Sequence, residues 1–280
     1  MFFFTRHELE QYLVEDMPYH DLSAEAIDAS GTARIDYVTR EPGVACGAEE
    51  VRQLADTLGL VTQRAVPSAS PIETGQTLFS ATGETQAVFA LWKVGQNLLD
   101  RGSGIATAAR RWRNTLDEAG FDLPVLITRK TMPGAKKLLT KAAVAGGAVP
   151  HRLGLSETLL FFDQHVEVAG GEHAFLQRLP HIRRRHVEKK IIVETADVEF
   201  AGAVLGAGAD GIQFDKVPAD ELTSCVDVLR AGFDHPVLLA AGGVSLRNCV
   251  QYAAAGVDGL VTSAVYQAPP LDIGVRIIRT

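Results

Sequence analysis

The sequence of 280 residues contains few cysteines, few aromatic residues and no long apolar run. Its three cysteines, Cys46, Cys225 and Cys249, are odd in number and far apart, which excludes a disulfide framework and a paired-cysteine zinc site. No stretch of about 18 apolar residues occurs, so no membrane-spanning helix is expected. The apolar start at residues 2–4 is too short for the core of a signal peptide. We therefore expect a cytoplasmic protein with free thiols and no membrane partner.

The sequence also has fewer basic than acidic residues, with 27 Lys and Arg against 34 Asp and Glu, which gives a formal net charge of −7. Nucleic acids and anionic membranes need a basic face, so neither is expected as a partner. The exception is a basic run at residues 183–190, which lacks interleaved aromatic residues. We expect this run to be a solvated helix face. A small anionic substrate is compatible with the overall balance, since its binding depends on local clustering of charge.

The first hundred residues have the pattern of an antiparallel sheet with a few helices. Residues 8–15 have helical spacing of apolar positions, and residues 31–47 alternate apolar and polar positions before a Pro-Gly turn. Short β-branched runs broken by Pro and Gly follow between residues 58 and 85. A helix is expected over residues 86–99, ended by the Arg-Gly-Ser-Gly segment at 101–104.

From residue 106 the pattern changes to apolar strands that alternate with helices. Seven strands are expected, at residues 123–128, 143–149, 157–162, 190–194, 211–215, 236–240 and 259–262. Several are continuous apolar runs, as in parallel strands covered on both faces. The sequence therefore predicts an α/β protein whose residues 106–265 form a (β/α) barrel, complete or open. The string GAGADG at 206–211 lies between a helix and a strand, which is the wrong context for a dinucleotide-binding loop.

In such a barrel, functional residues gather at the carboxyl ends of the strands. The residues that follow or end these strands are Arg129, Lys130, His151, Arg152, Glu194, Asp215 and the turn Ala241-Gly242-Gly243. Paired arginines can clamp carboxylates, and Lys is suited to phosphate. Two carboxylates plus a substrate diphosphate suit Mg²⁺. A glycine turn before a helix offers backbone N–H groups to phosphate.

Each of these assignments has a structural alternative. Arg129 and Arg152 could form surface ion pairs, Lys130 could be a solvated helix start, and His151 could be a core histidine. Glu194 and Asp215 could pair with the same arginines and lysine instead of a metal ion.

Several segments resemble the quinolinate phosphoribosyltransferase family, and they occur in the family's order. They are residues 15–23 (EDMPYHDLS), 40–44 (REPGV), 100–107 (DRGSGIAT), 128–134 (TRKTMPG), 151–155 (HRLGL) and 269–273 (PPLDI). The resemblance implies an N-terminal α/β sandwich domain over residues 1–105, to which residues 268–280 return. An open α/β barrel is implied over residues 106–267.

The resemblance also implies roles for individual residues. Arg129, His151 and Arg152 would hold the carboxylates of the aromatic substrate, together with Arg101 from the partner subunit of a homodimer. Lys130, Glu194 and Asp215 would serve phosphoribosyl diphosphate and its Mg²⁺, and the glycine turn and Ser263 would lie at the 5′-phosphate.

Three departures from the family's pattern bear on the substrate. Phe162 stands where the family has a lysine that contacts substrate or diphosphate, Ala241 replaces a serine, and Ser263 replaces a glycine. The pattern resembles the ModD branch, pyrophosphorylases named for molybdenum-transport gene clusters. Loss of a buried charged contact costs roughly 2–5 kcal/mol of binding if nothing compensates.

The leading hypothesis is a Mg²⁺-dependent phosphoribosyltransferase acting on quinolinate or a related aromatic acid, which releases diphosphate. With quinolinate it would also release CO₂ and give nicotinate mononucleotide. One alternative keeps the phosphoribosyl donor and changes the acceptor, because Phe162 makes that side of the pocket apolar and could stack on a ring; such an acceptor could be linked to molybdenum metabolism. The other is a non-catalytic binding or regulatory protein with the same fold.

Overall fold

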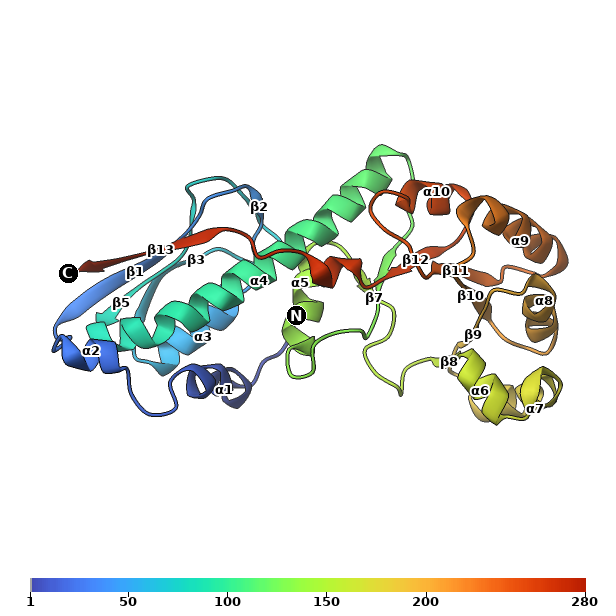
Figure 1. The fold of residues 1–280 in the computed structure, drawn as a ribbon, viewed down its shortest axis with the longest axis horizontal. Helices are drawn as coiled ribbons and strands as arrows, with labels where there is room; N and C mark the ends of the chain where they lie inside the picture. The colour runs from blue at the N-terminus through green and yellow to red at the C-terminus, as the bar shows by residue number, and fades with distance from the viewer. Residues whose placement is uncertain (1) are drawn as a thin grey trace. The chain divides into compact units, whose positions relative to one another are not determined.

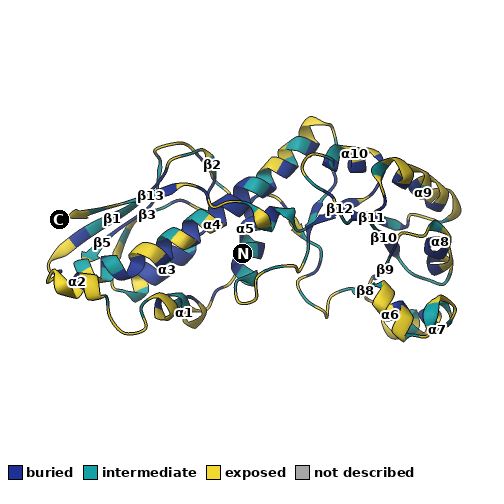
Figure 2. Ribbon diagram, viewed as in Figure 1, coloured by how far each residue is buried: buried dark blue, intermediate teal, exposed yellow. Residues whose placement is uncertain are grey.

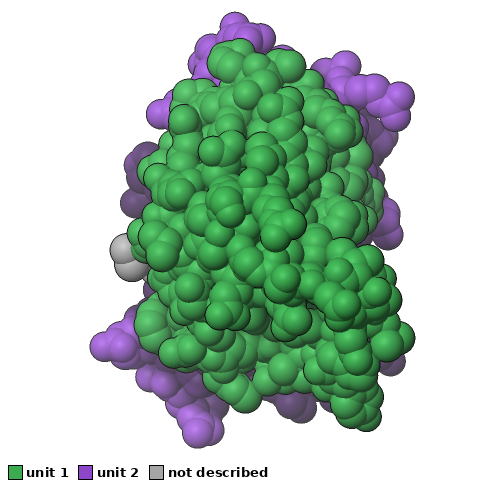
Figure 3. Space-filling view, turned by 90° about the vertical axis from the view of Figure 1, so that its left-hand side faces the viewer, with its two compact units in different colours: residues 1–110, 132–147, 265–280 green, residues 111–131, 148–264 purple. Residues whose placement is uncertain are grey.

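The computed structural model describes residues 2–280, which group into two compact units. Unit 1 comprises the residues up to 110 together with 132–147 and 265–280, and unit 2 comprises residues 111–131 and 148–264 (Figure 3). Residues 132–147, which the sequence analysis assigned to the barrel region, therefore group with unit 1. Of residues 2–280, none lies in a helix long and apolar enough to cross a membrane.

Unit 1 is built on a four-stranded antiparallel sheet with the strand order β13-β1-β5-β3 (Figure 1). Its strands are β1 (Thr32–Thr39), β3 (Val61–Ala65), β5 (Thr77–Glu84) and β13 (Ile273–Arg279), and a separate short pair is formed by β2 (Gly43–Val44) and β4 (Pro71–Ile72). The last strand, β13, pairs along the whole of β1, from Ala33 opposite Arg279 to Thr39 opposite Ile273. The end of the chain thus completes a sheet that the first hundred residues begin.

Four helices of unit 1 share a core with this sheet. They are α1 (Arg6–Asp16), α3 (Ala48–Thr57), α5 (Lys136–Ala145) and the greater part of α4 (Thr85–Glu118), and the short helix α2 (Leu22–Ala26) also belongs to unit 1. Tyr37 and Phe79 from the sheet are fully buried together with Leu54 of α3 and Leu91 of α4. The helical spacing of apolar residues accounts for this packing, because it gathers the apolar side chains of a helix on one face, which is then buried.

The expected end of a helix at residues 101–104 is wrong, because α4 continues through this segment to Glu118. Its glycines allow close packing instead of ending the helix. A Cβ at Gly102 would lie 2.9 Å from the backbone oxygen of Cys46, and one at Gly104 would clash with that of Pro269. Ser103 between them is buried, and its hydroxyl accepts a hydrogen bond of 3.0 Å from the Cys46 N–H.

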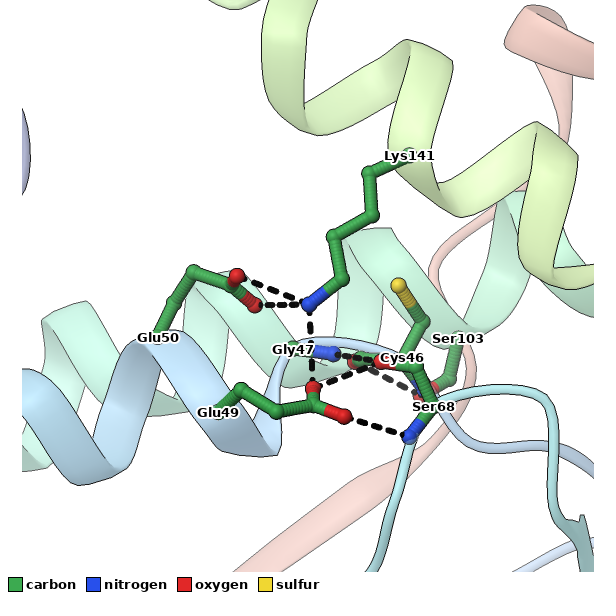
Figure 4. A network of polar contacts seen from close by, with 7 residues as sticks. All are labelled: Cys46, Gly47, Glu49, Glu50, Ser68, Ser103 and Lys141. Carbon is green, nitrogen blue, oxygen red and sulfur yellow. Dashed lines mark hydrogen bonds and ion pairs between the residues drawn. The ribbon is translucent and has the colours of Figure 1, made fainter. Parts of the chain in front are cut away.

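A buried ion cluster joins α5 to α3 within unit 1 (Figure 4). The Lys141 ammonium donates to Glu50 at 2.6 Å and to Glu49 at 3.0 Å, and the Glu50 side chain is only 2% exposed. Burial would raise the pKa of Glu49, but hydrogen bonds from Ser68 and Lys141 outweigh it and lower that pKa to about 2. The same contacts raise the pKa of Lys141 against the effect of its burial. Glu49 and Lys141 are therefore charged across the physiological pH range.

Unit 2 contains a seven-stranded sheet in the order β7-β6-β12-β11-β10-β9-β8, in which every pair is parallel. Its strands are β6 (Val125–Ile127), β7 (Val149–Pro150), β8 (Leu159–Phe161), β9 (Ile191–Thr195), β10 (Gly211–Asp215), β11 (Val237–Ala241) and β12 (Gly259–Thr262). The edge strands β7 and β8 do not pair with each other, so the barrel is open. The predicted fold class, an N-terminal α/β sandwich domain plus an open (β/α) barrel, is confirmed.

Helices connect the barrel strands and cover the sheet. They are α6 (Asp163–Val168), α7 (Gly171–Arg185), α8 (Val198–Gly206), α9 (Ala219–Gly232) and α10 (Cys249–Ala254), followed by the short 3₁₀ helix η1 (Ala264–Gln267). In Figure 2 the central strands are buried, while α9 alternates buried and exposed positions. The GAGADG string spans the end of α8 and the start of β10, which confirms that it is no dinucleotide loop.

The strand expected at residues 143–149 is largely wrong. Helix α5 runs to Ala145, and only Val149–Pro150 is extended. A short continuous apolar run does not distinguish a buried helix from a strand by its periodicity. Gly146 ends the helix where it lies against the backbone of Ala106 and Arg110, an approach that a Cβ would obstruct.

Strand register defines one face of the unit 2 sheet that carries both apolar and polar groups. Gln213 lies opposite Glu194 on one side and Leu239 on the other, and Asp215 follows Gln213 by two residues. Leu239, Ala241 and Val261 form a small apolar cluster with Leu126. Residues opposite one another in a parallel sheet, and residues two apart along a strand, share a face. Glu194, Gln213 and Asp215 therefore project on the same side as this cluster.

Candidate active site

Every barrel residue that the sequence singled out lies at or just beyond the carboxyl end of a strand in unit 2. The order along the sheet is His151 and Arg152 after β7, Arg129 and Lys130 after β6, Ser263 after β12, Ala241, Gly242 and Gly243 at β11, Asp215 at the end of β10, Glu194 near the end of β9, and Phe162 after β8. Because the strands are all parallel, these ends share one edge of the sheet. The predicted cationic, acidic and glycine positions thus lie together at the end of the barrel where the strands finish, which is called the mouth of the barrel below.

The cationic side of this mouth holds a buried arginine that has no carboxylate counterion among residues 2–280. Arg152 is 8% exposed, and its burial and the nearby charge of Arg129 lower its pKa. Some other arginines of unit 2 are paired with a carboxylate, as Arg183 is with Asp210 at 2.5 Å and Arg230 is with Asp258 at 2.7 Å. Within residues 2–280 neither Arg129 nor Arg152 forms an ion pair with a carboxylate. Two neighbouring cations, one of them buried, strongly favour the binding of an anion beside them.

His151 adjoins this pair and is held neutral. Its burial and the charge of Arg152 lower the pKa of the imidazole below its ordinary value of 6.5. The free protein therefore carries an uncharged His151 at pH 7. One nitrogen of this neutral ring can donate a hydrogen bond, and the other can accept one.

Phe162, which follows the other edge strand of the sheet, β8, contacts this cationic group. The guanidinium carbon of Arg152 lies 5.8 Å from the centroid of the Phe162 ring, a cation–π distance. The other neighbour of the ring is His165, stacked at 5.7 Å between centroids with 27° between the planes. The His165 Nδ1 accepts a hydrogen bond of 3.0 Å from the Phe162 N–H, so its Nε2 carries the proton when the ring is neutral. The sequence analysis missed His165, whose only signal was its position three residues after Phe162.

The acidic side of the mouth is formed by β9 and β10. Burial raises the pKa of Glu194, a hydrogen bond from the Gln213 amide opposes this, and the charges of Asp215 and Asp163 raise it further. Lys130 is close enough to lower the same pKa. Among residues 2–280 no direct ion pair joins Glu194 or Asp215 to Arg129, Lys130 or Arg152. The charged neighbour of Asp215 is Lys216, at 3.5 Å.

The donor set on this side fits Mg²⁺ that arrives with a substrate. The described part of the chain contains no group of three or more His, Cys, Asp or Glu residues arranged to hold a metal ion. Mg²⁺ commonly binds through one or two carboxylates together with substrate phosphates, and does not need a cage made by protein alone. Glu194 and Asp215 supply two such carboxylates, on neighbouring strands and on the same face of the sheet.

The glycine turn after β11 has a backbone conformation that favours glycine. Gly242 and Gly243 have φ angles of 72° and 82°. A Cβ at Gly242 would lie 2.6 Å from the backbone nitrogen of Lys216, whereas one at Gly243 would meet nothing within 4 Å. Only a glycine therefore fits at the first position, and the second opens onto free space where an anion could approach the backbone.

Two polar residues that the sequence analysis missed fix this turn. Asn248 donates to the Gly243 carbonyl at 3.1 Å and accepts from the Ser245 N–H at 2.7 Å. Thr262 donates to the Val244 carbonyl at 3.2 Å and accepts from the Ala264 N–H at 3.1 Å. Thr262 thus ties the segment that carries Ser263 to the glycine turn, and it holds the two predicted phosphate positions together.

Gln213 is the third residue that the sequence analysis missed. It had a signal, because it is a polar residue in the middle of an apolar strand and two residues before Asp215. Arg101, by contrast, lies exposed on α4 in unit 1, and its predicted contact with a partner subunit stays a prediction.

The fold is that of a known enzyme class, which comparison with known proteins identifies. Residues 21–103 match the N-terminal domain of quinolinate phosphoribosyl transferase, and residues 105–276 match its C-terminal domain. The chain belongs to the quinolinate phosphoribosyl transferase family, which consists of pentosyltransferases.

Within the family, the chain is similar to proteins of two names. It is 30% identical over 278 residues to "Putative pyrophosphorylase ModD" of Escherichia coli O6:H1, covering 99% of this chain and 98% of that protein. It is also 30% identical over 266 residues to a protein of Archaeoglobus fulgidus named "Probable nicotinate-nucleotide pyrophosphorylase [carboxylating]", covering 94% and 100%.

A solved structure supports the fold. The nicotinate-nucleotide pyrophosphorylase of Ehrlichia chaffeensis superposes with a TM-score of 0.90 at 23% identity, covering 99% of this chain and 100% of that one. The resemblances predicted from sequence, both to the family and to the ModD branch, are confirmed.

Proposed function

We propose that this protein is a Mg²⁺-dependent phosphoribosyltransferase that joins phosphoribosyl diphosphate to quinolinate or a related aromatic acid and releases diphosphate. With quinolinate the products would be nicotinate mononucleotide, diphosphate and CO₂. The observation that carries this proposal is the unpaired cationic group at the barrel mouth, where Arg152 is 8% exposed beside Arg129. A carboxylate-bearing substrate would supply the missing counterion.

The residues divide between the two substrates. Arg129, His151 and Arg152 would hold the carboxylates of the acid and direct its ring nitrogen at the anomeric carbon of the sugar. Lys130 would neutralise the departing diphosphate, and the turn at Ala241–Gly243 with Ser263 would bind the 5′-phosphate through backbone N–H groups. Catalysis of this kind rests on positioning and charge stabilisation at an oxocarbenium-like centre, without a protein nucleophile.

Glu194 and Asp215 would hold the metal ion. Bound Mg²⁺ would neutralise charge on the diphosphate and orient it as a leaving group. The alternative function within this fold is transfer to a different aromatic acceptor. The observation that favours it is the apolar Phe162 ring beside Arg152. This ring offers a stacking surface at the position where the family has a lysine.

The first experiment is to incubate the purified protein with phosphoribosyl diphosphate, Mg²⁺ and quinolinate, and to follow diphosphate release and formation of nicotinate mononucleotide. Turnover of about 1 s⁻¹ or more would support quinolinate as the substrate. Mg²⁺-dependent binding of phosphoribosyl diphosphate without product would favour the changed acceptor. If neither compound is bound, the transferase proposal is wrong and a non-catalytic role takes its place.

Two substitutions test whether the mouth of the barrel is the site. Arg129→Ala should abolish binding of the acid, and Glu194→Ala should abolish Mg²⁺-dependent binding of phosphoribosyl diphosphate. A matched control is Arg184→Ala, which removes an exposed arginine at the end of α7. Full activity of Arg129→Ala or Glu194→Ala would contradict the assignment.

A further inference from the structure

Gln213 has an amide group that is only half satisfied. The residue is 4% exposed in the middle of β10, opposite Glu194 on β9 and Leu239 on β11. Its Nε2 donates to a carboxylate oxygen of Glu194. Its Oε1 is buried and has no hydrogen-bond partner within residues 2–280.

The orientation of this amide follows from the chemistry of its neighbour. An ionised carboxylate only accepts hydrogen bonds, so the NH₂ side of the amide must face Glu194. The carbonyl oxygen is then left next to an apolar group that includes Leu239 and cannot donate. A buried acceptor without a partner costs free energy of folding, and such groups in native proteins often mark a place where a ligand, ion or water binds.

The chemical groups of the proposed substrates limit what could donate a hydrogen bond to the Gln213 carbonyl oxygen. Phosphate, diphosphate and aromatic carboxylate groups are acceptors at neutral pH, apart from a weakly acidic last phosphate proton, and so they do not satisfy a carbonyl oxygen. The sugar hydroxyls are donors. Glu194 and Gln213 present two acceptors side by side, on neighbouring strands about 4.8 Å apart, which matches two hydroxyls on adjacent carbons.

Resting on the proposed function, we propose that the Gln213 carbonyl binds a hydroxyl of the ribose ring, beside a second hydroxyl bound by Glu194, so that the pair recognises the vicinal diol of the phosphoribosyl donor. Gln213 is then a substrate-binding residue that acts on the sugar and not on the diphosphate.

Two probes that share the diphosphate separate this role from a structural one. Binding of phosphoribosyl diphosphate and of diphosphate alone, both with Mg²⁺, is measured by calorimetry for the unsubstituted protein and for Gln213→Met. Methionine is similar in size and removes the carbonyl. We expect Gln213→Met to weaken phosphoribosyl diphosphate about 3- to 10-fold, as for loss of one neutral hydrogen bond, and to leave diphosphate unchanged. The control Ile212→Val, at a buried position facing the other side of β10, should change neither affinity.

Equal weakening of both probes would overturn the proposal, because Gln213 would then act only through Glu194 and the metal ion. No change in either affinity would overturn it as well. If the unsubstituted protein binds no phosphoribosyl diphosphate, the proposed function fails and this inference falls with it.

A second measurement does not depend on whether the variant folds. In a crystal structure of the unsubstituted protein with phosphoribosyl diphosphate and Mg²⁺, a ribose hydroxyl should lie within about 3.2 Å of the Gln213 Oε1. A water molecule or the metal ion at that oxygen would overturn the proposal.

Discussion

At the scale of single residues, the mouth of the barrel is arranged for ligands and not for stability. Arg152 is buried beside another cation, and the buried carbonyl of Gln213 has no hydrogen-bond partner within the described residues. Both groups lose solvation on folding, and neither gains an oppositely charged or hydrogen-bonding partner there in return. Such features reduce stability, and they persist where function requires them.

Replacement of Arg152 therefore separates stability from binding. Arg152→Met keeps an unbranched side chain of similar length and removes a desolvated charge that Arg129 repels. We expect the midpoint of thermal unfolding to stay the same or rise, because loss of the cation–π contact with Phe162 costs only about 0.5–2 kcal/mol. Binding of quinolinate should weaken by more than about 30-fold, as for loss of a charge-assisted pair. Thermal unfolding and calorimetry check the two effects, and a clear drop in stability with binding intact would contradict this account.

The depressed pKa of His151 predicts proton uptake on binding. In the free protein the imidazole is neutral at pH 7, because burial and the charge of Arg152 lower its pKa. A bound carboxylate raises this pKa, so affinity should increase as the pH falls through the pKa of the complex and should level off below that of the free protein. Calorimetry of quinolinate binding at pH 7 in two buffers with different ionisation enthalpies measures the protons taken up.

The matched variants for this measurement are His151→Gln and His181→Gln, the second being an exposed residue of α7. We expect His151→Gln to abolish the proton uptake and His181→Gln to leave it unchanged. Uptake that persists in His151→Gln would assign the titrating group elsewhere.

At the scale of elements, four strands that end at the site could be predicted, whereas the edge strand β7 and the full course of two helices could not. The strands over residues 190–194, 211–215, 236–240 and 259–262 are short, mainly apolar runs, and each agrees with the structure to within a residue. The course of α4 was missed, because Gly102 and Gly104 look like a helix end when their packing partners are unknown. These partners are distant in sequence, so no local pattern reports them. The last turn of α5 was missed, because the apolar run over residues 143–149 resembles a strand.

The ion cluster that joins α5 to α3 should be essential for the stability of unit 1. Lys141→Met leaves Glu50, 2% exposed, as a buried carboxylate without its counterion. We expect a loss of about 3–5 kcal/mol in the free energy of unfolding, measured by urea denaturation. The control is Lys137→Met, which removes a more exposed pair with Glu8 and should therefore destabilise the protein much less. A similar small loss in both variants would mean that Glu50 is protonated or solvated when Lys141 is absent.

At the scale of the whole molecule, the order of motifs along the chain predicted more than the individual elements did. Residues 269–273 were assigned to the first domain only through a family resemblance, and β13 does pair with β1 in the structure. No periodicity in the sequence indicates that pairing, because strand partners 240 residues apart leave no local signal. The proposed roles of Arg101 and Phe162 likewise came from motifs. The contact between Phe162 and Arg152 was found only in the structure, because no motif includes both residues.

The predicted homodimer can be tested by complementation, because a site that takes Arg101 from its neighbour is split between two chains. Arg101→Ala and Glu194→Ala should each be inactive as homodimers. When the two variants are mixed in equal amounts and allowed to exchange subunits, half of the dimers are mixed, and one of the two sites in each mixed dimer has both residues intact. We therefore expect about a quarter of the unsubstituted activity to return. Diphosphate release measures it, with each variant alone as the baseline. If Arg101 instead serves the barrel of its own chain, neither chain of a mixed dimer has a complete site, and activity stays at that baseline.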